Sequence, residues 1–127
     1  MLKTLVSLFA MTMLCLSVSW AQDPVDVSPQ YYKALFENDM VRVLEMRLPP
    51  GSEDAMHEHP TETVYFVSGG NLKITLPQGD ELQKEVIAGE VMFHDAWTHR
   101  VKNIGTSEVQ AIIVELKEST GTSGRLQ

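Results

Sequence analysis

A series of short β segments, separated by turn residues at nearly regular intervals, most constrains what this chain can fold into. Residues 41–48, VRVLEMRL, alternate apolar and charged side chains with a period of two, which is typical of a strand with one buried face. Residues 109–117, VQAIIVELK, are the most apolar segment and are predicted to lie in the middle of a sheet. Further strands are expected at 31–36, 63–67, 71–76, 81–87, 91–94 and 99–103. No window longer than one or two turns has helical spacing, so we expect a sandwich or small barrel.

A hairpin is expected in the middle of this series. Residues 77–80, PQGD, separate 71–76 from 81–87, and Pro, Gly and Asp are residues that tight turns use. The 127 residues suffice for one domain with a hydrophobic core and are too few for two. We therefore expect a single β-barrel domain over residues 31–118.

The two ends of the chain are predicted to lie outside this domain. Residues 1–21 combine a basic start, an apolar run and small residues before Gln22, the pattern of a cleaved secretory signal peptide. An uncleaved anchor is the alternative, because the apolar run approaches the roughly 20 residues that span a bilayer. Residues 22–30 are interpreted as a leader without chemistry, and residues 119–127 as a flexible tail. The signal predicts export to the periplasm or the extracellular space, with no membrane association after cleavage.

The predicted mature chain has a composition that excludes several classes of function. Cleavage after Ala21 removes Cys15, so disulfides and thiolate metal ligands are excluded. Without Lys3, nine basic residues face seventeen acidic ones, a net charge of about −8. Such a surface repels nucleic acid and anionic lipid, so neither is an expected partner.

Three histidines and one acid could form a metal site. His57 and His59 are two residues apart, so on an extended segment both side chains leave the same face. Glu62 has the wrong parity for an unbroken strand, but Pro60 can supply a bend that returns the carboxylate to that face. His99, at the start of another predicted strand, is the best candidate from a distant segment. Three nitrogens and one oxygen suit divalent Mn, Fe, Co, Ni, Cu or Zn. For the histidine pair alone, two solvated side chains in a surface loop are the alternative.

Residues 51–69, GSEDAMHEHPTETVYFVSG, resemble the first sequence motif of the cupin superfamily: glycine, five residues, His-x-His, a short gap, Glu, six residues and glycine. The residues at the motif positions are Gly51, His57, His59, Glu62 and Gly69. The gap before Glu62 is two residues, where the family commonly has three or four.

Residues 89–103, GEVMFHDAWTHRVKN, resemble part of the second cupin motif through Gly89, His99 and Asn103. Asp95 stands where the family has proline, and Trp97 stands where it has glycine. One residue rather than two separates Trp97 from His99.

The resemblance implies a jelly-roll β-barrel with a divalent metal inside it. Its ligands would be His57, His59, Glu62 and His99; without Glu62, three histidines with open coordination positions remain. Glu62 and His94 are the candidate catalytic residues, because either could handle a proton. For His94, orienting a ligand or simply packing at a strand end are the alternatives.

The fold alone does not decide the function, since cupins include both enzymes and binding modules. By family analogy we expect a metal-dependent small-molecule enzyme, dioxygenase-like or else an isomerase or lyase. A non-catalytic module that binds a small ligand is the first alternative, and a β-sandwich with incidental histidines is the second. We also expect a homodimer, in which strands before Gly51 pair and cover an exposed edge.

Overall fold

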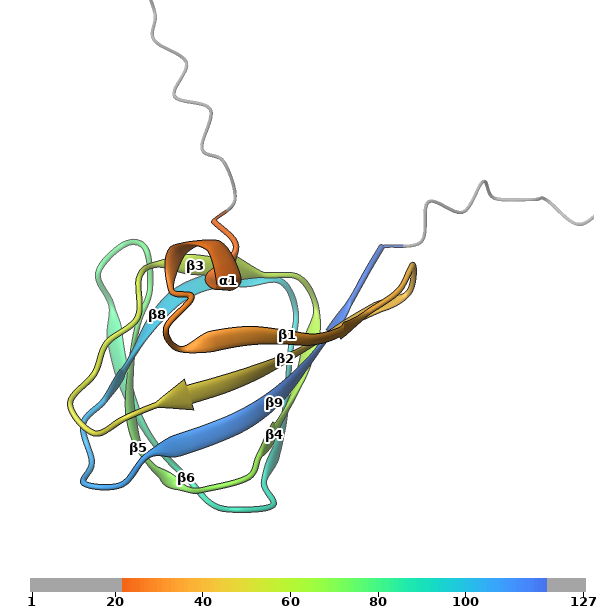
Figure 1. The fold of residues 1–127 in the computed structure, drawn as a ribbon. Helices are drawn as coiled ribbons and strands as arrows, with labels where there is room; N and C mark the ends of the chain where they lie inside the picture. The colour runs from red at the N-terminus through yellow and green to blue at the C-terminus, as the bar shows by residue number, and fades with distance from the viewer. Residues whose placement is uncertain (1–21, 119–127) are drawn as a thin grey trace, which may run out of the picture.

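The computed structural model describes residues 22–118, which form a one-turn helix and nine strands in two antiparallel sheets (Figure 1). The elements are α1 (Pro24–Val27), β1 (Tyr32–Glu37), β2 (Val41–Leu48), β3 (His57–His59), β4 (Glu62–Phe66), β5 (Gly70–Thr75), β6 (Glu81–Val86), β7 (Val91–His94), β8 (Trp97–Asn103) and β9 (Val109–Leu116). The predicted signal peptide, 1–21, and tail, 119–127, lie outside the described residues. No helix within 22–118 has the length and apolar character needed to cross a membrane.

The strand order is that of a jelly roll. One sheet has the order β1-β2-β9-β4-β7, and the other has the order β3-β8-β5-β6. After β2, the chain passes from one sheet to the other at every connection except the β5–β6 hairpin. This arrangement confirms the predicted all-β jelly-roll barrel.

All eight predicted strands are present. β9 lies at the centre of its sheet between β2 and β4, as its apolar sequence predicted. The β5–β6 hairpin is also confirmed, and Gly79 in its turn has a φ of +99°, a region that favours glycine. Two elements were not predicted, namely α1 and the three-residue strand β3. β8 also begins at Trp97, two residues earlier than the pattern indicated.

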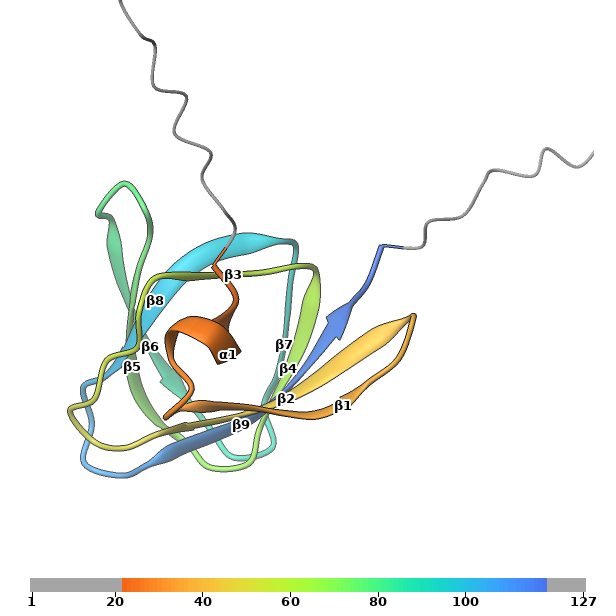
Figure 2. The same ribbon diagram turned by 45° about the horizontal axis from the view of Figure 1, so that its top comes forward.

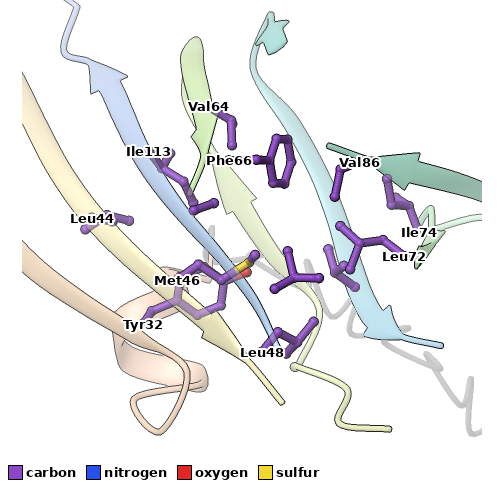
Figure 3. Close-up of a cluster of buried hydrophobic side chains, with 13 residues drawn as sticks. Tyr32, Leu44, Met46, Leu48, Val64, Phe66, Leu72, Ile74, Val86 and Ile113 are labelled. Carbon is purple, nitrogen blue, oxygen red and sulfur yellow. The ribbon is translucent and has the colours of Figure 1, made fainter. Parts of the chain in front are cut away.

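The hydrophobic core lies between the two sheets. Alternate residues of β2 and β9 point inward, where they meet side chains of β4 and β5 (Figure 3). The buried apolar residues are Tyr32, Leu44, Met46, Leu48, Val64, Phe66, Leu72, Ile74, Val86, Val101, Val109, Ala111 and Ile113. The half-buried strand that the period of two predicted over residues 41–48 is therefore present, and β9 also buries alternate residues.

Two residues of the cupin-like motifs serve the fold rather than the site. A Cβ on Gly69 would lie 2.5 Å from the carbonyl oxygen of Val86, so only glycine allows the backbone this close approach. The buried amide of Asn103 donates to the carbonyl oxygens of Leu48 and Ser107, each at 2.8 Å. These contacts connect loops at one end of the barrel.

The leader packs against the barrel, which the sequence did not indicate. α1 lies at one end of the barrel near β1 and β3 (Figure 2). The Gln22 carbonyl accepts a hydrogen bond from the Glu58 amide at 2.8 Å, and Ser28 Oγ accepts one from the Ala55 amide at 2.8 Å. The leader therefore contacts the backbone on both sides of His57.

Candidate metal centre

The short strand β3 places its two histidines inside the barrel. β3 pairs with β8 so that His57 lies opposite His99, and His59 lies opposite Trp97. His57, His59 and His99 are 0%, 1% and 4% exposed, whereas Glu58 points outward. One ring nitrogen from each of the three histidines lies within 4.8 Å of the others. The structure thus brings together the three histidines that the sequence selected.

Hydrogen bonds orient both imidazoles of β3. His57 Nδ1 lies 2.8 Å from the Ala55 carbonyl oxygen, and His59 Nδ1 lies 2.7 Å from Glu115 Oε1. Because both oxygens only accept, each Nδ1 is assigned the proton, and each neutral ring keeps its lone pair on Nε2. The two Nε2 atoms are 2.9 Å apart. Two lone pairs at this distance repel each other unless a cation lies beside both.

Burial keeps the imidazoles of His57 and His99 neutral. Desolvation, with a smaller effect of His59, lowers the pKa of His57 to about 4. Desolvation also lowers the pKa of His99 to about 2, and the neighbouring histidines add to this shift. A neutral imidazole is the form that binds metal. His99 Nδ1 is buried and has no hydrogen-bond partner within the described residues, so this nitrogen is not engaged by the protein.

Glu62 enters the site from the other sheet. Pro60 and Thr61 carry the chain from β3 in one sheet to β4 in the other, so the parity of a single strand no longer applies. Trp97 Nε1 donates to Glu62 Oε1 at 2.8 Å. Oε2 is buried and, among residues 22–118, has no hydrogen-bond partner, although His59 Nδ1 lies 3.3 Å away. Burial raises the pKa of Glu62.

Glu62 does not join the cluster of three histidines. Its carboxylate lies instead in a second group, with His59 and Glu115, whose ligand atoms are also within 4.8 Å of one another. The two groups share His59. A His/Glu cluster suited to metal binding is therefore present, and its tightest nitrogen set consists of His57, His59 and His99.

Glu115 is a member of the site that the sequence analysis missed. It is 1% exposed, and its Oε2 accepts from Arg42 Nε at 2.6 Å while Oε1 faces His59. Burial by itself would raise the pKa of Glu115, but hydrogen bonds from His59 and Arg42 outweigh it, and the pKa is lowered. One signal was available: Glu115 has the same inward parity on β9 as Ala111 and Ile113.

An ion-pair chain continues from Glu115 to the leader. Arg42 contacts Asp23 Oδ2 through a terminal guanidinium nitrogen at 2.6 Å. Asp23 also begins α1, where its Oδ1 accepts from the Val25 amide at 2.9 Å. The chain Asp23–Arg42–Glu115–His59 therefore connects the leader to a candidate ligand. Partners of this kind orient ligands and set their basicity.

A second buried pair lies beside His57. Tyr32 Oη donates to Asp54 Oδ2 at 2.7 Å and lies 3.5 Å from His57 Nε2. Asp54 Oδ1 accepts from the Val101 amide at 2.6 Å. Burial raises the pKa of Asp54 to about 6 and, with Asp54, raises that of Tyr32. The hydroxyl is thus held in its protonated form next to the histidine cluster.

His94 is not among the candidate ligands that the described part of the chain brings together. Its ring stacks on Trp97, with centroids 4.1 Å apart and planes at 11°. Burial, with a smaller effect of Lys84, lowers its pKa. His94 lies opposite Glu62 in the pairing of β7 with β4, and its role in proton transfer remains a prediction.

Comparison with known proteins agrees with the fold. Residues 44–115 match the family model described as Cupin domain. A cupin domain from Bordetella pertussis Tohama I is 26% identical, with a TM-score of 0.62, over 68% of this chain and 91% of that one. A conserved protein with a double-stranded β-helix domain from Klebsiella pneumoniae is 22% identical, with a TM-score of 0.56, over 70% of this chain and 77% of that one. No curated protein matches significantly. Because the family model spans more than half of the 127 residues, the chain belongs to the cupin family.

Proposed function

We propose that this protein is an exported cupin enzyme that binds one divalent transition metal ion through His57, His59 and His99. The observation that carries the proposal is the 2.9 Å separation of two Nε2 atoms whose partner nitrogens are already hydrogen-bonded. A metal ion between such atoms turns their repulsion into coordination. The buried, unpartnered His99 Nδ1 belongs to the third histidine of the same cluster.

The ligand types restrict the ion and its chemistry. Imidazole nitrogens suit Fe, Mn, Co, Ni, Cu and Zn, and three protein ligands leave positions open for a substrate. When bound, such an ion supplies Lewis acidity or, for a redox-active metal, one-electron chemistry. Dioxygenase-like chemistry is our first choice, and an isomerase or lyase activity is the second.

Glu62 is proposed to accept a proton during the reaction. Trp97 occupies Oε1, which leaves Oε2 free. Burial moves the pKa of this carboxylate toward pH 7. A general base is most effective when its pKa lies near the working pH. Glu62→Gln retains the size and the acceptor oxygen but removes the charge. We expect its metal affinity to stay within about tenfold of wild type while turnover is lost. A fall in metal affinity beyond 100-fold, the upper end for residues that only orient ligands, would instead make Glu62 a ligand.

Elemental analysis of purified protein tests the metal directly. We expect about one equivalent of a transition metal after reconstitution. Less than a tenth of an equivalent would overturn the proposal. Oxygen uptake and product formation with small phenols, keto acids and other carbonyl compounds then distinguish an enzyme from a binder.

A non-catalytic binding module is the second candidate. It is favoured by one observation: within the described part of the chain, the cavity beside the cluster is lined by no proton-transfer groups besides His59, Glu62 and His99. Thermal stabilisation by a compound that is never turned over would support this candidate.

Export and self-association are part of the proposal. N-terminal sequencing of the secreted protein should begin at Gln22 if the predicted signal is cleaved. β1 lies at the edge of its sheet and exposes Leu35 and Phe36, which supports pairing with a second copy. Light scattering should then give the mass of a homodimer.

A further inference from the structure

A small cavity next to the histidine cluster is almost entirely apolar. Thirteen residues line it, and ten of them are aliphatic, thioether or aromatic. Val64, Phe66 and Ile113 come from one sheet, and Leu72, Ile74 and Val101 come from the other. Figure 3 shows several of these side chains pointing into the space between the sheets. The cavity therefore combines a polar end, at the cluster, with an apolar body.

The polar residues of the cavity are those of the proposed metal site. They are His59, Glu62 and His99. Over the described range 22–118, no Lys, Arg, Ser, Thr, Asn or Gln lines it. The nearby guanidinium of Arg42 is already paired with Glu115 and Asp23. A sugar or phosphate group placed here would lose its water without gaining hydrogen bonds, which disfavours binding.

The size of the cavity limits the ligand further. The space open to the centre of a water-sized sphere is about 40 Å³. Since one water needs roughly 10–15 Å³ on this measure, the cavity holds only a few non-hydrogen atoms as it stands. Met46 and Met92 lie in its wall, and flexible thioether chains can adjust to a slightly larger ligand.

A larger outer hollow adjoins the cavity. Ile74, Met92 and Trp97 line both spaces, so these three side chains separate them. Trp97 is held by its hydrogen bond to Glu62 and by the stacked ring of His94. Among residues 22–118 the Met92 side chain has no hydrogen-bond partner, and it is the more easily displaced part of the partition.

We propose that the site takes a small compound with one metal-binding oxygen group and a short apolar body, such as a short-chain monocarboxylate, and that it rejects sugars and phosphate esters. This inference rests on the proposed metal centre, which would bind the oxygen group. The apolar walls supply the selectivity for the rest of the molecule, and entry from the outer hollow passes Met92.

The test uses the full mature protein loaded with zinc, which has no redox chemistry, and isothermal titration calorimetry. Butyrate and 4-hydroxybutyrate are the probes, because they share a carboxylate and differ in one terminal hydroxyl. We expect butyrate to bind at least about fivefold more tightly, since a buried hydroxyl without a partner is disfavoured. From acetate to propionate to butyrate, affinity should rise roughly fourfold for each methylene until the cavity is filled. Equal or tighter binding of 4-hydroxybutyrate would overturn the proposal.

A pair of matched variants locates the selectivity. Val64→Thr puts a hydroxyl into the cavity wall with little change of shape. Val91→Thr puts a hydroxyl outside the cavity, on the next residue pair of the same two strands, at a side chain that is 60% exposed. We expect Val64→Thr to reduce the preference for butyrate several-fold and Val91→Thr to leave it unchanged. Equal effects of the two substitutions would also contradict the proposal.

Metal-free protein separates this inference from the proposed function. If the wild type takes up no zinc, the metal proposal fails, but the apolar cavity can still be tested with butan-1-ol and butane-1,4-diol. The alcohol should shift the methyl NMR signals of Val64 and Ile113, and the diol should shift them at least fivefold less at equal concentration. Equal shifts, or none with either probe, would overturn the selectivity inference by itself.

Discussion

The two sides of His59 have opposite hydrogen-bonding states. On the Nε2 side, ring nitrogens of His57, His59 and His99 lie within 4.8 Å of one another, and His99 Nδ1 has no partner within the described residues. On the Nδ1 side, the chain Asp23–Arg42–Glu115 is ionic, and its contacts are 2.6 to 2.7 Å long. The Nδ1 atom of His59 therefore already has its hydrogen-bond partner in the protein. The nitrogens on the Nε2 side find a partner only when a cation binds. The contrast shows that a buried network with all its hydrogen bonds made can orient neighbouring side chains whose ligand atoms are still free.

The largest expected effect comes from removing a nitrogen on the Nε2 side. His59→Ala deletes a ligand and frees Glu115, so we expect metal affinity to fall by more than about 100-fold, beyond the range typical of residues that only orient ligands. Competition with a chromophoric chelator measures it. Glu58→Gln, on the outer face of the same strand, is the control and should bind like wild type. Similar losses in both variants would show that the effect comes from disruption of β3.

Removing Arg42 from the ion-pair chain on the Nδ1 side should lower both the stability and the metal affinity of the protein. Arg42→Met leaves the Glu115 carboxylate buried without its cation, so the free energy of unfolding should fall by about 3 kcal/mol. Metal affinity should fall by about 10- to 100-fold, because His59 loses a well-oriented partner.

Arg47→Met is the matched control for Arg42. Arg47 also pairs with two acids, but it is half exposed and screened by water, so its loss should destabilise the protein much less than the loss of Arg42. Urea unfolding compares the two variants. Equal destabilisation would remove the special role assigned to the buried chain.

The neutral cluster predicts an acid-sensitive metal-free protein. Because the folded pKa values of His57 and His99 are about 4 and 2, below the ordinary value of 6.5, the unfolded chain binds more protons as the pH falls. Their contribution to stability is present above pH 6.5 and is lost below it. Asp54, with its pKa raised to about 6, acts in the opposite direction and offsets part of the loss. We expect a net decrease on the order of 2 kcal/mol between pH 7 and pH 5.

Urea unfolding at the two pH values, in the presence of a chelator, measures this decrease. His99→Gln should flatten the pH dependence, because it removes one of the two titrating groups. A wild-type protein that is equally stable at pH 5 and pH 7 would contradict the neutral state of the cluster.

The smallest effect is expected at the leader end of the chain. Asp23→Asn retains a side chain that can cap α1 but removes the charge beside Arg42. Because Asp23 is about a third exposed, stability should change by less than about 1 kcal/mol, and metal affinity by only a few-fold. Asp26→Asn, on the same helix, is the control. Identical metal affinities in the two variants would show that Asp23 does not contribute to metal binding and that the effect of the ion-pair chain stops at Arg42.

Local sequence patterns were sufficient to predict much of the fold and about half of the residues at the site. The alternation in 41–48 and the apolar run in 109–117 identified β2 and the central strand β9. The two-residue spacing of His57 and His59 predicted their common face, and Pro60 marked the point where the chain changes sheets. These features depend on backbone geometry over a few residues, which the sequence determines directly.

The remaining members of the site could not be found in this way. Glu115 lies 56 residues from His59, and Arg42 lies 73 residues from Glu115. Their contacts depend on the register in which β9 pairs with β2 and β4, where Arg42 and Glu62 both lie opposite Glu115. A shift of one residue in either pairing would place Glu115 opposite a different residue, and the side chains that now meet would point to opposite faces of the sheet.

By itself, the sequence determined the strand pattern, the cupin motifs and the inward pair of histidines, because each depends on residues close together in the chain. Only the tertiary structure decided that Glu115, Arg42 and Asp23 connect the leader to His59, and that Glu62 keeps one free oxygen beside an apolar cavity. The physical reason is that hydrogen bonds and burial at this site join strands from both sheets, and their alignment is set by packing across the whole barrel.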